Sequence, residues 1–228
     1  KGGERPTALT AMLYRIIIKL RRPIIGDWED QNHGFWDSAV KGSSPLRAAL
    51  ARALRMEAGV AMGFVAVGGL WDVAEFFDSI RLDELITMAL DQQFPPQILM
   101  LAVNVHSGVR AFRGGPYVSQ WVKPSGQSII AGCGCSVSFT RALLYNLMQK
   151  LHIEHPTTIA NTWVDDIAQT AVGPHEVVVG SAIEASTQLV EGLRQQGLNI
   201  SPKSRFVASD MKAARAIQAA LSKRGIDV

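Results

Sequence analysis

The sequence is poor in cysteine. Only Cys133 and Cys135 occur among its 228 residues, and their Cys-x-Cys spacing is too short for an easy disulfide. The pair is also two ligands short of a typical structural zinc set. We therefore expect neither a disulfide framework nor a zinc module, and we expect an intracellular protein, either nuclear or cytoplasmic.

Long apolar runs are missing as well. The longest apolar stretches, such as residues 16–18 and 60–70, are far shorter than a membrane span. No signal-peptide pattern opens the chain, and no internal repeat or low-complexity segment interrupts it. Because the chain has no apolar stretch of membrane-spanning length and no signal-peptide pattern, we expect no membrane partner. The chain also starts without methionine and stops directly after a helical pattern, so we expect it to be part of a longer protein.

The overall composition is that of an ordinary globular protein. It is 47% hydrophobic and 19% charged, with a net charge of +3 and a pI near 9.0. A mildly basic balance permits a nucleic-acid partner without establishing one. The basic residues gather in clusters that are either solvated helix faces or parts of one channel: Lys1/Arg5, Lys19/Arg21/Arg22, Arg47/Arg52/Arg55, Lys203/Arg205 and Lys212/Arg215/Lys223/Arg224.

Hydrophobic periodicity and turn residues predict an α+β protein. Apolar residues over 9–20 favour a helix that Pro23 ends, followed by a loop over 26–44. Ser44-Pro45 favours the start of a second helix, whose apolar stripe Leu46, Leu50, Ala53 and Leu54 ends at Gly59. Further helices are expected over 82–92, 97–106, 138–150, 182–196 and 211–222, and strands over 64–73, 116–122, 158–164, 167–172, 198–200 and 206–207.

Two pairs of aspartates stand out in this pattern. Asp72 ends the expected strand over 64–73 and is followed by Asp78, and Asp165-Asp166 forms the tip of an expected hairpin. A bare Asp-Asp is usually a solvated turn. Carboxylates from separate strands are nevertheless the hard oxygen ligands that Mg²⁺ prefers, and two such ions assist phosphoryl transfer. The sequence therefore predicts a metal site.

In order, these elements resemble a reverse transcriptase of the non-LTR retrotransposon and group II intron branch. The segments that carry the resemblance are Lys1-Gly2-Gly3-Glu4-Arg5-Pro6, Asn32-His33-Gly34-Phe35, the run from Asp72 to Ile80, Gly132-Cys133-Gly134-Cys135-Ser136 with Leu144-Tyr145-Asn146, Trp163-Val164-Asp165-Asp166, and Gly197-Leu198-Asn199-Ile200 with Lys203-Ser204. Several motifs in the right order are far more specific than any single one.

The resemblance implies a fold and a domain division. The fold is the right-hand palm of a polymerase, an antiparallel sheet with helices packed on one face, with partial fingers and no thumb. Residues 1–59 would be the partial fingers and residues 60–228 the palm, with a fingers-like excursion around 107–127. The longer parent protein would supply the thumb and could carry an endonuclease domain.

The resemblance also implies an activity, RNA-directed DNA synthesis by two-metal nucleotidyl transfer. Its partners would be an RNA template, a DNA primer and deoxynucleoside triphosphates, with Mg²⁺ or Mn²⁺ as cofactor. Two ions would be held by Asp72, the Val73 carbonyl, Asp165 and Asp166, and Lys203 would protonate the leaving pyrophosphate. Nucleotide contacts would come from Lys1, Arg5, Phe77, Gly132 and Cys133, with the Phe77 ring excluding a ribose 2′-hydroxyl.

Departures from the family pattern keep other interpretations open. Ala131 stands where the family usually has glutamine, Ser128 where it has glycine, and Gly134 replaces a frequent proline. A decayed or co-opted retroelement fragment that binds RNA without polymerising is therefore an alternative. An RNA-templated RNA polymerase is opposed by Phe77, and a nucleotide cyclase by the fingers and glycine-loop segments. We interpret Asp78 as structural, and His152 and His155 as surface or packing residues.

Overall fold

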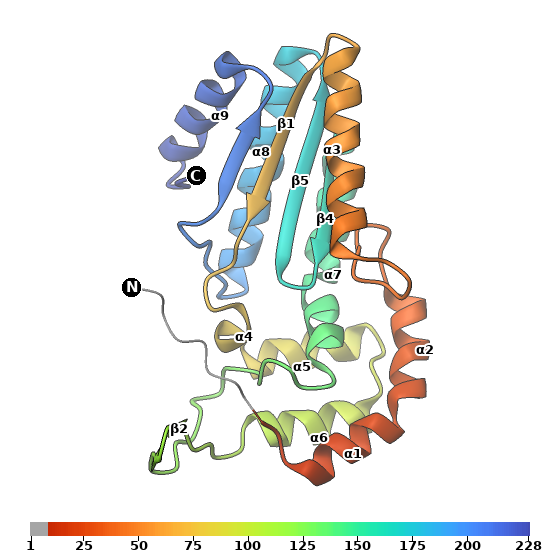
Figure 1. Ribbon diagram of the computed structural model, residues 1–228, viewed down its shortest axis with the longest axis vertical. Coiled ribbons are helices and arrows are strands. Elements are labelled where there is room, and N and C mark those ends of the chain that lie inside the picture. The colour runs from red at the N-terminus through yellow and green to blue at the C-terminus, as the bar shows by residue number, and fades with distance from the viewer. Residues whose placement is uncertain (1–8) are drawn as a thin grey trace. The chain divides into compact units, whose positions relative to one another are not determined.

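The structure, a computed structural model, describes residues 9–228 (Figure 1). The chain forms two compact units: Lys1–Asn32 with Glu75–Leu143, and His33–Ala74 with Leu144–Val228. The boundary between them falls inside helix α7 (Ser136–Glu154). The expected division at residue 60 into fingers and palm is a functional assignment that these units do not test, and it stays a prediction.

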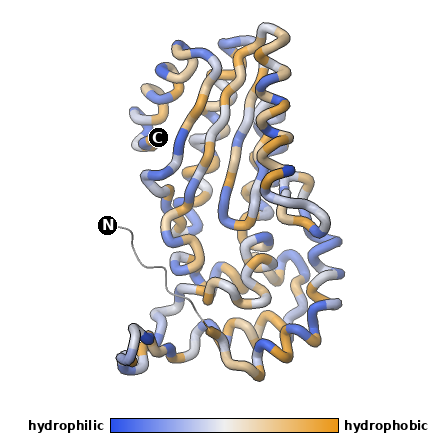
Figure 2. The backbone as a smooth tube through the Cα atoms, in the orientation of Figure 1, coloured by the Kyte–Doolittle hydropathy of each residue, from blue (hydrophilic) through white to orange (hydrophobic). Residues whose placement is uncertain are grey.

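The second unit is built on a four-stranded antiparallel sheet with the order β4-β5-β1-β6. Its strands are β1 (Val65–Trp71), β4 (Thr158–Trp163), β5 (Asp166–Gly173) and β6 (Arg205–Ala208). Hydrophobic residues run along the central strands (Figure 2). A nearly continuous apolar run is typical of a strand covered on both faces. The hairpin carrying Asp165-Asp166 is confirmed, and so is the strand expected over 64–73, which ends at Trp71 so that Asp72 follows it directly.

Helices contact this sheet from both faces, which corrects the expectation that they pack on one face. On β5, Gln169 donates a hydrogen bond of 3.1 Å to the Ala185 carbonyl of α8 (His175–Gln195). Val172 instead faces Gly59 of α3 (Pro45–Ala61), where any larger side chain would collide with it. Because residues three apart on a strand point to opposite faces, α3 and α8 lie on opposite sides (Figure 1).

The orientation of α3 follows its smallest residue rather than its apolar stripe. Ser44 caps the helix as expected, accepting a hydrogen bond of 3.2 Å from the Arg47 amide. The apolar stripe, however, faces away from the sheet, with Leu46, Leu50 and Leu54 exposed by 77%, 53% and 55%. The helix turns its small residue Gly59 toward β5 because close approach to Val172 requires a missing Cβ.

The first unit is mainly helical. Its elements are α1 (Met12–Leu20), α2 (Arg22–Asn32), α4 (Phe76–Ser79), α5 (Leu82–Asp91), α6 (Pro96–His106) and a hairpin of β2 (Arg113–Gly114) with β3 (Tyr117–Val118). Its core includes Trp28, which donates to the Gln92 carbonyl at 2.7 Å and packs edge-on against Phe94. The loop expected from residue 26 is therefore wrong in its first part. Pro23 opens α2, where its missing N–H costs nothing.

Several other element boundaries differ from the sequence prediction. The strand expected over 116–122 is reduced to β3, and the one over 198–200 to a bridge between Val73 and Ile200. Helix α8 begins seven residues earlier than expected, directly after Pro174, and α9 spans Met211–Lys223. No helix within residues 9–228 combines the length and the hydrophobicity needed to cross a bilayer.

Candidate active site

A strained turn carries one of the predicted metal ligands, Asp165, and directly precedes another, Asp166. Trp163 and Asp166 close the β4–β5 hairpin, so the turn consists of Val164 and Asp165. Val164 has φ 57°, which a β-branched residue rarely adopts. Such a conformation costs on the order of 1–3 kcal/mol and persists where the surrounding structure imposes it, often at a functional site. The strain therefore marks this hairpin tip as a candidate site.

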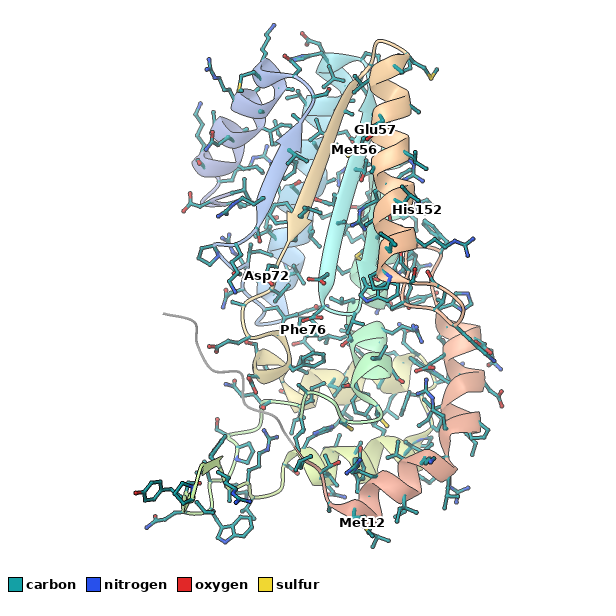
Figure 3. The ribbon with its side chains drawn as sticks, viewed as in Figure 1. Met12, Met56, Glu57, Asp72, Phe76 and His152 are labelled. Atoms are coloured by element: carbon teal, nitrogen blue, oxygen red, sulfur yellow. The ribbon has the colours of Figure 1, made fainter. Side chains whose placement is uncertain are left out.

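The third acidic residue, Asp72, follows directly after the neighbouring strand β1 (Figure 3). Trp71 pairs with Ile167 of β5, so one further step of the same register brings Asp72 opposite Asp166. Residues directly opposite one another in an antiparallel pair point to the same face of the sheet. The fold thus brings Asp72 and the Asp165-Asp166 turn together although they are distant in sequence.

The backbone of Asp72 is held on both sides by one turn. Its amide donates to the Ser204 hydroxyl at 3.0 Å, and its carbonyl accepts from the Ser201 amide at 2.7 Å and from the Ser204 hydroxyl at 3.3 Å. Both serines are buried. Lys203, the predicted proton donor, is exposed in the same turn. The turn thus holds the Asp72 backbone in place, and Lys203 is the residue directly before Ser204 in that turn.

The carboxylates also influence one another electrostatically. Partial burial raises the pKa of Asp166, and the nearby charges of Asp165 and Asp72 raise it further, while Arg52 of α3 opposes the shift. Like charges that share a site disfavour joint ionisation. A cation between these carboxylates would relieve the repulsion.

The donor set suits an ion that is shared with a substrate. Within residues 9–228, no group of three or more His, Cys, Asp and Glu side chains is placed to enclose a metal ion. Mg²⁺ commonly uses one or two carboxylates and completes its shell with substrate phosphates. The Val73 carbonyl fits this mode too, because the bonds beside the Val73–Ile200 bridge use Asp72 and Ala74 rather than Val73. Asp72, Asp165, Asp166 and the Val73 carbonyl remain predicted ligands.

The predicted nucleotide contacts lie elsewhere in the chain. Lys1 and Arg5 fall outside the described residues. Phe77 is half-buried, packs edge-on against Phe76 at 5.4 Å, and its carbonyl accepts from the Ile129 amide at 2.8 Å. Gly132 is exposed with φ 82° and has open space beside its Cα. Phe77 and Gly132 both belong to the first unit.

The Cys133 side chain faces inward. It is 5% exposed, and its Sγ lies 2.9 Å from the Tyr14 hydroxyl. Hydrogen bonds, chiefly from Cys135 and also from His106 and Tyr14, lower the pKa of Cys133 to about 4 against the opposing effect of burial. In this arrangement any nucleotide contact at Cys133 would come from its backbone, because the thiol belongs to the core of the first unit.

His152 is one of the two histidines that we interpret as surface or packing residues. It packs edge-on against Phe35, with ring centroids 4.1 Å apart. This contact confirms the interpretation of His152 as a packing residue.

Ser201 and Ser204, which hold the Asp72 backbone, were not among the predicted site residues. Their signal was a pair of hydroxyl residues flanking Pro202-Lys203, a composition that reads as an ordinary turn.

Solved structures of telomerase from Candida tropicalis share this fold. The apo telomerase truncated from its C-terminal domain matches 86% of this chain with a TM-score of 0.56 and 11% identity, and 40% of that chain is covered. The telomerase in complex with a TWJ fragment of telomeric RNA matches 87% of this chain with a TM-score of 0.59 and 11% identity, and 33% of that chain is covered. The fold is reverse-transcriptase-like.

The reverse-transcriptase-like fold is what these comparisons show. At 10–11% identity the likeness concerns architecture alone, and this chain spans well under half the length of the telomerase chains it matches. No protein-family model matches the sequence, and no curated protein is similar to it.

Proposed function

We propose that this reverse-transcriptase-like domain is an RNA-directed DNA polymerase of the non-LTR retrotransposon and group II intron type. The observation that carries the proposal is that Asp72, directly after β1, lies close enough to the strained Val164-Asp165 turn for its charge to act on Asp166. Folding alone gains nothing from three neighbouring carboxylates, because their repulsion is a cost. A two-metal polymerase needs them.

In this function the site residues hold the metal ions and the substrate in position and neutralise charge. None of them forms a covalent bond with the substrate. Bound Mg²⁺ ions would activate the primer 3′-hydroxyl and neutralise charge on the triphosphate. Asp72, just after β1, and Asp165, in the β4–β5 turn, would hold the ions, and the serine turn would keep the Asp72 backbone in place. Lys203, exposed in that turn, would donate a proton to the departing pyrophosphate. Partners would be an RNA template, a DNA primer and deoxynucleoside triphosphates.

A primer-extension assay with an RNA template, a DNA primer, deoxynucleotides and Mg²⁺ tests this function. Asp165→Asn and Asp72→Asn should each abolish extension while leaving the circular dichroism spectrum and the unfolding midpoint close to wild type. Glu57→Gln is a matched control, because Glu57 is exposed on the outward face of α3 (Figure 3). Extension by Asp165→Asn at the wild-type rate would rule out the proposed site.

The alternative is a domain that binds RNA without polymerising. Ala131 favours it, because an exposed methyl group stands where the family places a glutamine amide. The same assay separates the two functions when it is run beside an RNA-binding measurement. Binding without extension under every template, primer and metal condition would favour the alternative.

A further inference from the structure

A hairpin in the first unit exposes three aromatic rings. This segment, residues 109–123, contains β2 and β3 and is called the aromatic hairpin below. Phe112, Tyr117 and Trp121 are exposed by 55%, 79% and 73%. Exposed hairpin tips usually carry small or polar residues, since exposed apolar surface gains nothing from water. Three large rings on one short hairpin therefore need a reason.

The backbone of the hairpin presents two of these rings together. Gly114 pairs with Tyr117, and Gly115 at φ 58° starts the two-residue turn that joins the strands. The Ser119 amide donates to the Phe112 carbonyl at 2.8 Å, which places Phe112 opposite Ser119. Phe112 and Tyr117 are thus diagonal neighbours on one face, with Cα atoms about 7–8 Å apart.

The charged residues of the hairpin itself have one sign, and the Asp78 carboxylate lies beside Arg110 at its base. The hairpin carries Arg110, Arg113 and Lys123, and the sequence contains no acidic residue between Asp91 and Glu154. Arg113 and Lys123 are exposed. A surface of this kind repels basic partners and attracts polyanions at a distance.

The base of the hairpin is anchored. Arg110 donates to the His106 carbonyl of α6 at 2.6 Å, and to the Ser128 hydroxyl and carbonyl at 2.9 and 3.0 Å. Val122 and Arg110 exchange two backbone hydrogen bonds of 2.8 Å. The rings therefore stand on a fixed base, which lowers the entropy lost when a ligand binds them.

We propose that the aromatic hairpin is a docking surface for single-stranded RNA. Bases would stack on Phe112, Tyr117 and Trp121, while Arg113 and Lys123 would neutralise neighbouring phosphates, a combination that binds single strands with little sequence preference. The choice of RNA rather than DNA rests on the proposed function, which takes an RNA template. The stacking itself requires no catalysis, so the two proposals can fail separately.

Photocrosslinking with the 228-residue chain tests the contact directly. An oligouridine that contains 5-iodouridine should crosslink to the aromatic hairpin, and mass spectrometry should place the adducts on Phe112, Tyr117 or Trp121. Fluorescence anisotropy with labelled oligouridine gives the affinity. Each ring replaced by alanine should weaken binding about tenfold. Tyr117→Phe and Trp121→Phe should retain most of it, because both keep a stacking face.

Charge variants give a second, independent readout. Replacing Arg113 and Lys123 by glutamine should lower the salt dependence of binding by about 0.7 for each charge removed. Lys212→Gln and Leu46→Ala are matched controls, since both residues are exposed on other elements and should change neither value. All variants should keep the wild-type unfolding midpoint, because every replaced side chain is exposed.

Three results would overturn the proposal. The first is binding that the ring and charge variants leave unchanged, with no adduct on the hairpin. The second is tighter binding of oligothymidine than of oligouridine, which would remove the assignment to RNA. The third is self-association that the ring variants abolish, which would make the hairpin a contact between copies of the chain. Lost primer extension with intact crosslinking would instead count against the polymerase function alone.

Discussion

The Ser128 hydroxyl donates a hydrogen bond of 2.9 Å to the Asp78 carboxylate, and it accepts one of the same length from Arg110. Ser128 has φ 83°, a backbone conformation that normally favours glycine. The residue that departs from the family's glycine therefore keeps a glycine-like backbone, and Asp78 and Arg110 hold its side chain. Asp78 acts as a structural residue here, because its carboxylate accepts the hydrogen bond of the Ser128 side chain.

This relationship predicts an unusual order of stabilities at position 128. Ser128→Ala loses the hydrogen bonds and keeps the strain, so it should lower the free energy of unfolding by about 1–2 kcal/mol. Ser128→Gly loses the same bonds but relieves a strain of about 1–2 kcal/mol, so it should lie close to wild type. Urea unfolding followed by circular dichroism measures both. An alanine variant as stable as the glycine variant would show that the strain is absent.

Replacement of Phe77 should separate selection of the sugar from packing. Phe77→Val should allow an extending polymerase to incorporate ribonucleotides, because it opens space beside a 2′-hydroxyl. Its stability loss should be smaller than that of Phe76→Ala, about 3–5 kcal/mol, since Phe76 is 3% exposed and Phe77 only half-buried. Primer extension with ribonucleotides and urea unfolding check the two parts. Unchanged discrimination in a folded Phe77→Val protein would assign the ring to packing alone.

The raised pKa of Asp166 predicts how stability depends on pH. The folded chain holds this proton at a pH where the unfolded chain has released it, so the stabilisation is complete below the unfolded pKa and is lost as pH rises through the folded one. Asp166→Asn should therefore be more stable than wild type at neutral pH, with a gain that shrinks toward acid. Because Asp166 is partly exposed, the gain should stay below about 1 kcal/mol.

Mg²⁺ should favour the ionised form of Asp166, which is the opposite of what burial and the neighbouring carboxylates do. Millimolar Mg²⁺ should raise the unfolding midpoint of the wild type at neutral pH more than that of Asp166→Asn, because bound cations stabilise the ionised carboxylates. Glu57→Gln should respond like the wild type. If the stability difference between wild type and Asp166→Asn depends on neither pH nor Mg²⁺, the proposed coupling among the carboxylates is disproved.

Gln169 holds β5 to its neighbours on the face of the sheet opposite the carboxylates. Its side-chain oxygen accepts from Trp71 Nε1 at 2.9 Å and from the Ser186 hydroxyl at 3.0 Å. Gln169→Leu leaves both buried donors without their acceptor, which should cost about 2–4 kcal/mol. Ser186→Ala should cost about 1 kcal/mol alone and less in the Gln169→Leu background, as a double-mutant cycle would measure. If the free-energy changes of the two single variants simply add in the double variant, Gln169 and Ser186 do not act in one hydrogen-bond network.

Local patterns were sufficient for most of the elements and for the hairpin tip. Alternation of apolar residues, the Asp165-Asp166 turn and the cap at Ser44 all act over a few residues, so the sequence shows them directly. The short strands were harder, because two-residue ladders such as β2 and β3 leave almost no periodic signal. The role of Ser201 could not be predicted either, because its amide donates to the Asp72 carbonyl, more than a hundred residues away in the chain.

By itself, then, the sequence determined which residues carry charge at strand ends, since strand propensity and turn chemistry are local properties. Only the tertiary structure decided that Asp72 lies near the Asp165-Asp166 turn, because that proximity depends on the register between β1 and β5. It also decided that the leucine stripe of α3 faces outward. An apolar periodicity defines a helix face but not its partner, and here the close approach of Gly59 to Val172 selects the other face.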